Sequence, residues 1–427
     1  MSQTELTPDQ KGLASLTLGE VIKQTKDNFP DPKYRPQALY DSAYYHQSAI
    51  KVGKHKVWLT ADGIGTKPEL AERMYHLTGD PTYFENLAHD TFAMVKGDTD
   101  RFGHFLLGVA NIVDINTADP IVIDALAKGA KAACDEGCFA MINGETAELG
   151  YRTSGYGETR VNWNAVGLML INPDKVILGD KLEPGQPIVG LQEKTIRSNG
   201  LSKARAIAEA AYLQKLGFAS KTEYFLKNLD KLVDEYEVYG IQGYEIHFSD
   251  FMEDSEILNF FDKILGHNFL EQVLLPWHEE FPELAKELLR PSNLYGKLIY
   301  EAQGGVDGPK NIEITGAAHI SGGGVPEKTK RMVEPKGLGA YIEAVFPDPE
   351  GIRLLLELNR DLPEQLVDDR SACMQWNRGL GFPIVTPTYN EVDNLIEMAH
   401  SLGQEAVIVG EIINKPQIEY HGHIWKY

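Results

Sequence analysis

One short segment, ADGIGTKPELAERM, combines residue types that can hold a phosphate group or a metal ion. Gly63 and Gly65 allow the backbone to turn tightly and to approach a ligand closely. Thr66 offers a hydroxyl, and Lys67 can meet a phosphate as a point charge. The carboxylate of Asp62 supplies the oxygen ligand that Mg²⁺ prefers. The spacing fits neither a Walker P-loop nor a dinucleotide-binding fingerprint, so alone the segment predicts either a phosphate and metal corner or a simple turn before a helix.

Two further acids, Asp90 and Asp98, lie eight residues apart in the run LAHDTFAMVKGD. On a helix they fall about two turns from each other on nearly the same face, so both can point at one metal cluster. Carboxylates that share a site repel each other unless cations neutralise them. The functional interpretation therefore requires Mg²⁺, and two solvated acids are the alternative.

The segment MINGETAELG carries Glu145 and Glu148 after an apolar run. If the strand ends before them, the two carboxylates lie beyond its carboxyl end, where α/β folds place ligands. This position predicts a further polar part of a ligand site, and a simple loop is the other interpretation.

Arg197 opens the segment RSNG, which precedes a helix-like run. Backbone N–H groups at the start of that helix, together with the guanidinium, can hold a phosphate group. This segment predicts an anion or substrate cradle.

The segment GAAHISGGGVPEK joins a strand-like run to the three glycines 322–324 and places Pro326 at the expected start of a helix. The glycines and the helix start predict a second phosphate cradle. His319 either orients substrate there or is an ordinary buried, hydrogen-bonded histidine.

The elements that must position these residues follow an α/β pattern, because strand-like and amphipathic runs alternate along the chain. They are KVWLTAD and PELAERMYHL, FLLGVANIVDI and DPIVIDALAKGAKAACDEG, then FAMINGE, NAVGLMLI and, at the end, AYIEAVF and the terminal strand QEAVIVGEI. Prolines and glycines near residue 173 indicate a domain junction. We expect an N-terminal domain over 1–172, a C-terminal domain over 173–427 and, within the latter, an acidic helical insertion over about 219–289.

The composition is that of a globular protein, with 427 residues, 43% apolar and 24% charged. A formal net charge of −21 argues against broad binding to nucleic acid or to an anionic membrane. No apolar run is long enough to span a membrane, and the polar start lacks the features of a signal peptide, so we expect a cytoplasmic protein.

The three cysteines, Cys134, Cys138 and Cys373, are too few for a disulfide framework. Cys134 and Cys138 lie four residues apart in a helix-like stretch, where two buried thiols are a better interpretation than a metal pair. The sequence therefore predicts no zinc site.

Taken in order, these motifs resemble the family of phosphoribosylformylglycinamidine cyclo-ligases, also called aminoimidazole ribonucleotide synthetases. The resemblance covers most of residues 57–412, apart from the insertion and the stretch near 355–370. It runs through DGIGTK, the acids ending at Asp98, GETAE, NAVGLMLINPDKVILGDKLEPGQPIVGL, RSNGLSKAR, LLRPSNLYGKLI, GAAHISGGGVPEKTKRM, WNRGLGFPIV and GQEAVIVGEI. The order of the motifs carries the resemblance more than any single motif does.

The resemblance implies two α/β domains, the first pairing with its counterpart in a homodimer through strands that form a shared barrel. It also implies ATP and Mg²⁺ as cofactors, and it assigns roles to residues. The implied metal ligands are Asp62, Asp90 and Asp98, and the implied catalytic residues are Asp62, Lys67, Asp98 and His319. The implied ATP-binding residues are Gly63, Gly65, Thr66, Lys67, Asp90 and Glu145, and the implied substrate-binding residues are Arg197, Ser198, Asn199, Gly322, Gly323 and Gly324.

The implied reaction converts formylglycinamidine ribonucleotide and ATP to aminoimidazole ribonucleotide, ADP and phosphate in purine biosynthesis. Phosphorylation turns the amide oxygen into a good leaving group, and the amidine nitrogen then closes the ring. Such a step relies on positioning and charge neutralisation, which suits a site with carboxylates, glycines and a lysine.

Departures from the family pattern keep two other functions open. Arg197 replaces a histidine before Ser-Asn-Gly, the segment after Asp98 differs, and the helical insertion is extra. A related enzyme with another acceptor, of the thiamine-phosphate kinase, selenophosphate synthetase or hydrogenase-maturation type, is one alternative. The selenophosphate option is weakened because the first cysteine is Cys134. A non-catalytic nucleotide-binding assembly protein is the other.

Overall fold

The computed structural model describes residues 28, 31, 37–38, 48–228 and 275–427, and it divides into two compact units. The large unit comprises Met1–Leu201, Ala285–Arg353 and Asp368–Tyr427, and the small unit comprises Ser202–Leu284 and Leu354–Val367. Residues 229–274, most of the predicted insertion, lie outside the described residues. The predicted boundary near residue 173 remains a proposal.

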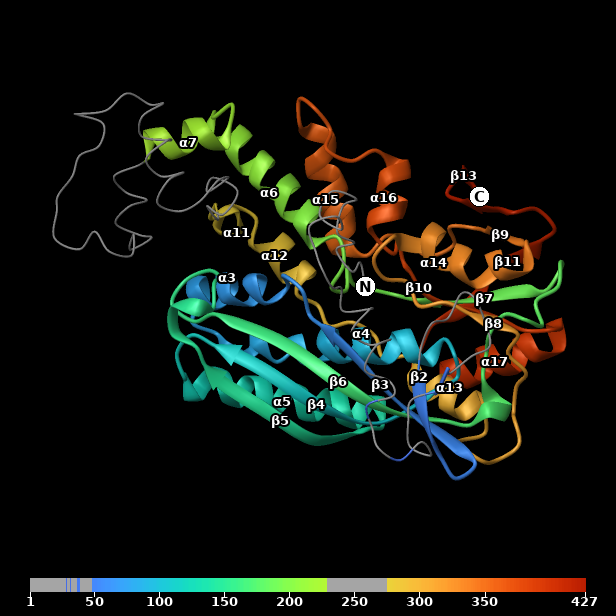
Figure 1. Ribbon diagram of the computed structural model, residues 1–427. Coiled ribbons are helices and arrows are strands. Elements are labelled where there is room, and N and C mark those ends of the chain that lie inside the picture. The colour runs from blue at the N-terminus through green and yellow to red at the C-terminus, as the bar shows by residue number, and fades with distance from the viewer. Residues whose placement is uncertain (1–27, 29–30, 32–36, 39–47, 229–274) are drawn as a thin grey trace. The chain divides into compact units, whose positions relative to one another are not determined.

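The first sheet of the large unit has six strands in the order β1-β2-β3-β6-β4-β5 (Figure 1). The strands are β1 Gln37–Ala38, β2 Ser48–Val52, β3 His55–Gly63, β4 Phe105–Ile115, β5 Ala140–Glu148 and β6 Val161–Ile171. Only β4 and β5 pair in parallel, through α5 (Pro120–Gly137), and the other described pairs are antiparallel. The edge strand β5 therefore follows a β-α-β connection, because parallel neighbours need a long crossover, which is usually a helix.

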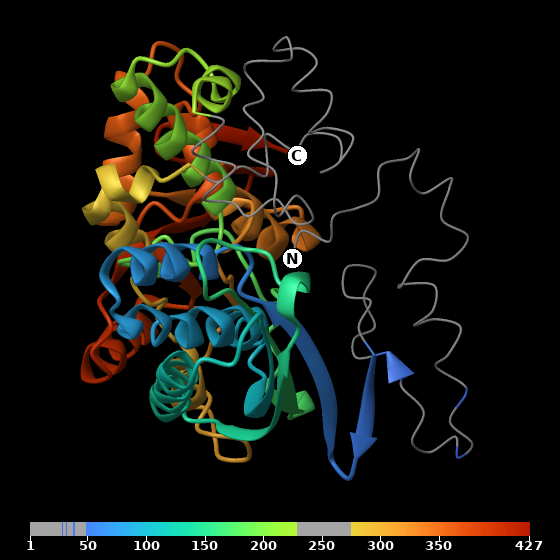
Figure 2. The same ribbon diagram turned by 90° about the vertical axis from the view of Figure 1, so that its left-hand side faces the viewer.

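Helices cover one face of the first sheet. They are α3 (Pro68–Thr78), α4 (Leu87–Asp100) and α5, which lie together on one side of the strands in Figure 2. Strand β6 alternates between fully buried and half-exposed residues from Val161 to Ile171, as expected when one face packs on helices and the other does not. The described residues place no helix on that second face, which we call the open face.

The second sheet of the large unit has seven strands in the order β13-β12-β9-β11-β7-β10-β8. Its strands are β7 Pro187–Gln192, β8 Gly316–Ala317, β9 Gly339–Ile342, β10 Leu380–Val385, β11 Ala406–Ile413, β12 Gln417–Tyr420 and β13 His423–Lys426. All described pairs are antiparallel except β9 with β12.

Both faces of the second sheet are buried by helices of the large unit. One core joins Ile188 of β7 to Val325 and Met332 of α14, and the other joins the next residue of β7, Val189, to helices α13 and α17. Successive side chains of a strand point to opposite faces, so the two cores lie on opposite sides of the sheet. The helices concerned are α13 Gly296–Ala302, α14 Gly324–Val333, α16 Asp369–Gln375 and α17 Tyr389–Ser401.

The remaining elements are short helices and the helices that supply the small unit. The 3-10 helices are η2 Pro81–Phe84, η3 Gly150–Arg152, η4 Pro173–Lys175 and η6 Glu334–Lys336. The other α-helices are α6 Leu201–Leu216, α7 Lys221–Lys227, α11 Trp277–Glu280, α12 Pro282–Leu288 and α15 Glu350–Asp361. Within the small unit, Gln214 of α6 donates a hydrogen bond to the carbonyl of Asp361, which ties α6 to the end of α15.

The predicted α/β class is confirmed, and the predicted strands and helices around residues 55–171 are present. Three local predictions were wrong. The strand near QEAVIVGEI is not the terminal one, because β12 and β13 follow it; Glu145 and Glu148 lie within β5 and not beyond it; and Cys138 is exposed. Gly144 within β5 and the short, polar sequences of β12 and β13 gave no clear strand pattern, which explains the first two errors. Cys138 follows the last residue of α5 in a left-handed conformation, with φ of 56°, which explains the third. Among the described residues, no helix is long and apolar enough to cross a membrane.

Candidate functional site

The turn between β3 and α3 holds the segment DGIGTK. Strand β3 ends at Gly63 and α3 begins at Pro68, so the turn occupies residues 64–67. Gly65 has a positive φ of 70°, a conformation that favours glycine. A Cβ at Gly65 would lie 3.8 Å from the carbonyl oxygen of Ser198, so this turn lies beside the RSNG segment. Two of the sequence motifs are therefore neighbours in space.

Lys67 is fully buried in the turn and forms an ion pair with Asp90 of α4. Its Nζ lies 2.7 Å from Oδ2 of Asp90 and donates a hydrogen bond of 2.8 Å to the carbonyl of Arg290. Ser292 donates a hydrogen bond of 2.5 Å to Oδ1 of the same carboxylate. Burial lowers the pKa of Lys67, and the charge of Asp90 opposes that shift. Asp90 thus has a cationic partner within the protein, and its predicted role as a metal ligand remains a prediction.

Asp98, two turns further along α4, belongs to a different set of contacts. Its Oδ1 lies 2.9 Å from Nδ1 of His319, and Nε2 of His319 lies 2.7 Å from Nη2 of Arg197. A guanidinium can only donate, so Nε2 of His319 accepts and the ring proton resides on Nδ1, which donates to Asp98. Arg197 also donates from Nη1 to Oε2 of Glu193 at 3.0 Å. The four side chains form a continuous chain of hydrogen bonds from Glu193 to Asp98.

The charge states in this chain follow from burial and neighbours. Burial, and then the charge of Arg197, lower the pKa of His319 to about 4, so the imidazole is neutral at pH 7. Burial opposes ionisation of Asp98, but the hydrogen bond from His319 and the charges of Lys328 and Arg101 hold the pKa of Asp98 well below its usual range. Asp98 is therefore a carboxylate whose side chain remains 30% exposed.

Asp62 and Asp98 act on each other electrostatically. Asp62 is the penultimate residue of β3 and pairs with Ala165, a buried residue of β6, so its side chain lies on the face of the sheet that the helices cover. Burial and the charge of Asp98 raise the pKa of Asp62, against a hydrogen bond of 2.8 Å from the N–H of Gly63. Lys328 of α14 interacts with both carboxylates. The structure thus brings together two acids from different elements and one lysine.

The substrate-side motifs lie beside each other at the starts of α6 and α14. A Cβ at Gly322 would lie 3.4 Å from Oδ1 of Asn199, so the triple-glycine loop contacts the RSNG segment. Gly323 is the N-cap of α14 and has φ of 93°, and Gly324 has φ of 64°. The hydroxyl oxygens of Ser198 and Ser321 are buried without a hydrogen-bond partner among the described residues. Unpaired buried hydroxyls are costly, so these two groups are available to donate to a ligand or to a water molecule.

Two other predicted residues, Thr66 and Glu145, take no part in the contacts described above. Thr66 is exposed at the turn. One row of paired residues crosses the sheet from β3 to β5. It runs through Gly63, Asn164 of β6, Ile112 of β4 and Glu145, so Glu145 lies on the edge strand, two strands beyond β6. This row of residues faces the open side, whereas Asp62 faces the helices. Within one chain, the two acids therefore lie on opposite faces of the first sheet.

Several residues of the site were not identified from the sequence. Glu193, Tyr295 and Ser292 anchor the site: Tyr295 donates to Oε2 of Glu193 at 3.0 Å, and Ser292 holds Asp90. Lys328 is 8% exposed and lies within the quoted segment GGGVPEK. Ser292, Tyr295 and Lys328 act on residues from distant parts of the chain, so no local spacing signals them, whereas Glu193 lies only four residues before its partner Arg197.

A cavity of about 500 Å³ lies between α5 and the strands β4 to β6. Its walls are mainly apolar and include Val113, Leu126, Phe139 and Trp163. None of the predicted site residues lines it, so it is separate from the cluster around Asp62 and Asp98.

Comparison with known proteins supports the resemblance drawn from the motifs. Residues 266–423 match the family model described as AIR synthase related protein, C-terminal domain. Phosphoribosylformylglycinamidine cyclo-ligase from Synechococcus sp. (strain CC9902) is 25% identical over 360 residues, which cover 84% of this chain and 81% of that protein. The protein of the same name from Bacillus thuringiensis (strain Al Hakam) is 25% identical over 362 residues with the same coverage.

Among solved structures, thiamine-monophosphate kinase from Stenotrophomonas maltophilia K279a superposes with a TM-score of 0.47 at 13% identity, covering 96% of this chain and 97% of that one. The resemblance predicted from the ordered motifs is confirmed at the level of the family.

Proposed function

We propose that this protein, a distant relative of the phosphoribosylformylglycinamidine cyclo-ligases with an AIR synthase related C-terminal domain, is an ATP-dependent cyclo-ligase. It would convert formylglycinamidine ribonucleotide to aminoimidazole ribonucleotide, with ADP and phosphate as the other products. One observation carries the proposal: the motifs that define the resemblance converge on the cluster of Asp62, Asp98, Lys328 and His319. Convergence of these segments is what a single reaction site requires.

Mg²⁺ fits the pair of carboxylates in this cluster. Asp62 and Asp98 offer oxygen ligands from two elements, and their mutual repulsion is relieved by a divalent cation. When bound, the ion neutralises charge on the phosphates of ATP. We assign Asp90 a different task, because Lys67 and Ser292 already occupy its two oxygens. Asp90 and Lys67 would fix α4 and the β3–α3 turn in the geometry that places Asp62.

The loops at the starts of α6 and α14 suit a phosphate group of the substrate. The N–H groups at the start of α14, the glycines that allow close approach and the unpaired hydroxyls of Ser198 and Ser321 provide donors. Asn199 adds an amide beside the glycine loop. Arg197 is 1% exposed and is bound to Glu193 and His319, so we propose that it positions His319 and does not contact substrate.

The chemistry needs no nucleophilic side chain. The γ-phosphoryl group of ATP passes to the formyl oxygen of the substrate, giving ADP and a phosphorylated imidate. The neighbouring amidine nitrogen attacks the same carbon, loses its proton and expels phosphate. The residues act by positioning these groups and by balancing charge, with Lys328 as the cation that faces both carboxylates.

A homodimer is the assembly we propose. The open face of the first sheet carries exposed apolar side chains, with Leu59 at 60%, Ile112 at 40% and Ile142 at 57% exposure. A Cβ at Gly108 would lie 2.8 Å from Cγ2 of Ile142, which places that side chain over the open face of β4. Exposed apolar side chains on one face of a sheet favour a protein interface. A second copy on this face would also bury the strand that carries Glu145.

The deciding assay follows ADP and aminoimidazole ribonucleotide together, with ATP, Mg²⁺ and formylglycinamidine ribonucleotide supplied. We expect both products, and neither when the ribonucleotide is omitted. ADP without the imidazole product would indicate a related enzyme with another acceptor. Nucleotide binding without either product would favour an assembly protein.

A further inference from the structure

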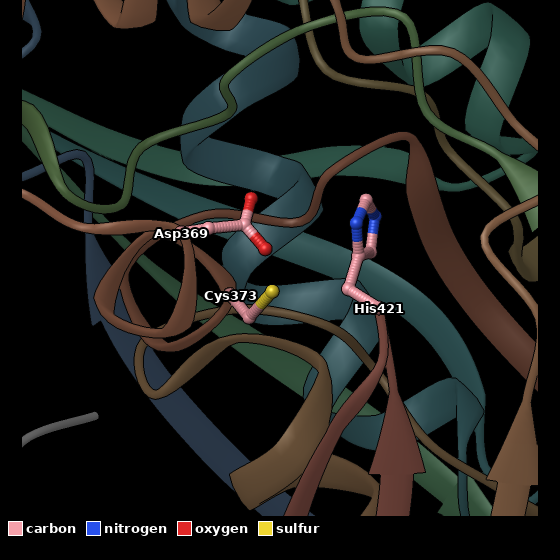
Figure 3. A group of neighbouring side chains, drawn as sticks. All are labelled: Asp369, Cys373 and His421. Atoms are coloured by element: carbon pink, nitrogen blue, oxygen red, sulfur yellow. The ribbon is translucent and has the colours of Figure 1, made fainter. Parts of the chain in front are cut away.

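Three potential metal ligands gather near the C-terminal end of the chain, in the large unit. Asp369 and Cys373 lie on α16, and His421 lies in the turn between β12 and β13 (Figure 3). One ligand atom from each side chain lies within 4.8 Å of the other two. None of them belongs to the motifs that define the proposed function.

The local geometry of each segment brings its ligands together. Asp369 and Cys373 are four residues apart on a helix, so they occupy the same face one turn apart. His421 has a positive φ of 50°, which is uncommon for a residue other than glycine, and it turns the chain so that the imidazole faces α16 (Figure 3). His423 lies two residues further on and places Nε2 3.0 Å from Oδ2 of Asp369.

One ring nitrogen of His421 lacks a hydrogen-bond partner. Its Nε2 is buried without a hydrogen-bond partner among the residues that the structure describes. A buried ring nitrogen with no donor or acceptor nearby is destabilising unless something binds it. Cys373 is completely buried, with its sulfur 3.8 Å from Nη1 of Arg378. Nη1 of Arg378 donates to this sulfur, so the thiol has a partner, and an ion held between Asp369 and Cys373 would lie beside the imidazole of His421.

The charge balance around the cluster also favours a cation. Arg378 is neutralised by Asp348, which receives hydrogen bonds of 2.5 Å from Nε and 3.0 Å from Nη2. Nη1 of Arg378 also donates to Oδ1 of Asp369 at 2.9 Å. With Arg378 and Asp348 cancelling each other, Asp369 and a Cys373 thiolate would together match a divalent ion.

We propose that Asp369, Cys373 and His421 form a zinc site. One sulfur, one imidazole nitrogen and one carboxylate oxygen are a donor set that suits Zn²⁺ and not Mg²⁺ or Ca²⁺. Tetrahedral coordination at ordinary zinc distances separates ligand atoms by roughly 3.3 to 3.8 Å, so a pair of ligand atoms at the 4.8 Å limit would close in by about 1 Å. His423 orients the carboxylate of Asp369, as partners of metal ligands do, and the exposed side of Asp369 provides the entry path.

The test measures metal bound to the full-length protein and does not depend on its activity. Chelator-treated protein is dialysed against Zn²⁺ in excess Mg²⁺, and zinc per chain is measured by mass spectrometry. We expect one zinc per chain, lost in Cys373→Ser and His421→Ala. Cys138→Ser, at an exposed thiol, and His400→Ala, at an exposed imidazole, are the matched controls and should keep the metal.

Replacement by Co²⁺ identifies the ligand. Bound Co²⁺ should show a thiolate-to-cobalt charge-transfer band that disappears in Cys373→Ser, whereas Co²⁺ at the carboxylates of Asp62 and Asp98 would show none. Because Cys373 is in the core, His421→Ala, at a half-buried turn, keeps the test valid if the first variant fails to fold. Absence of stoichiometric zinc in the wild type, or equal zinc in His421→Ala, overturns the proposal.

Discussion

At the scale of single residues, the site separates its charges into two groups. Lys67 and Asp90 are completely buried and satisfy each other, whereas Asp62 and Asp98 are partly accessible and repel each other. A buried ion pair fixes geometry, and two neighbouring acids that share one lysine carry a net negative charge that a cation can neutralise. The buried Lys67–Asp90 pair therefore holds the elements that position Asp62 and Asp98.

Removing one of the two accessible acids should abolish turnover without loss of folding. We expect Asp62→Asn to lower the rate of ADP formation by at least about 100-fold, because a charge that acts in the transition state is lost. Stability should be equal or higher, since the repulsion from Asp98 disappears. Asp124→Asn, an exposed acid on α5, is the control. Full activity of Asp62→Asn would remove this residue from the site.

Glu72 on α3 should make stability fall as the pH rises. It is 2% exposed and accepts hydrogen bonds from the N–H groups of Tyr156 and Val161, and burial raises its pKa to about 8. Between its ordinary pKa of 4.5 and about 8, the folded protein keeps a proton that the unfolded chain has released. The free energy of unfolding should therefore fall with pH by about 1.4 kcal/mol per unit in that range.

The comparison of wild type with Glu72→Gln isolates this contribution. The variant cannot titrate, so the difference between the two unfolding free energies should change with that slope from about pH 5 to pH 8 in urea titrations. Glu183→Gln, at an exposed position, should leave the wild-type pH dependence unchanged. Parallel curves for wild type and Glu72→Gln would contradict the prediction.

At the scale of elements, a glycine in α4 lets a loop from the second sheet approach the first. A Cβ at Gly97 would lie 2.4 Å from Nε2 of His319, far inside contact distance. Glycine is less favourable than alanine within a helix, but only glycine leaves room for the imidazole to reach Asp98. Packing of distant elements decides the residue at this position.

A double-mutant cycle tests this contact. Gly97→Ala should destabilise the protein by about 1–3 kcal/mol, because the methyl group overpacks against the ring. In a His319→Ala background the ring is absent, so the same change should stabilise by about 0.5–1 kcal/mol through helix propensity. Denaturant unfolding of the four proteins measures both effects. An equal effect of Gly97→Ala in both backgrounds would show that the two residues are not coupled.

At the scale of the molecule, the two sheets differ in how their faces are covered. Helices bury both faces of the second sheet, whereas the described part of the chain covers only one face of the first. The open face leaves apolar side chains in water, which a second copy of the chain would remove. This difference is the physical basis for the proposed homodimer.

Charges on the open face should separate the dimer. We expect Leu59→Glu with Ile142→Glu to shift the protein from dimer to monomer in sedimentation velocity experiments, because burying two charges without partners is costly. Ile121→Glu is the control, since Ile121 is 59% exposed at the start of α5, away from the open face. A wild type that sediments as a monomer would reject the dimer itself.

The sequence by itself determined the class of fold, most strands and helices of the first sheet, and the order of motifs that indicated the family. Alternating and helical periodicity report neighbours within one element, and the local chemistry of DGIGTK, RSNG and the glycine loop reports what a turn can bind. The family resemblance that these features indicated was the basis for predicting that Asp62, Asp98 and His319 share a site. The residue roles remain predictions.

Only the tertiary structure decided which distant residues meet. It paired Lys67 with Asp90 and Ser292, linked Glu193 through Arg197 to His319, placed Glu145 on the face opposite Asp62, and gathered Asp369, Cys373 and His421. Strand order and the side of the sheet that a helix covers set these contacts, and neither is encoded in spacing along the chain. For the same reason, the spacing of the three cysteines predicted no zinc site, although one of them lies beside a histidine and an aspartate once the chain is folded.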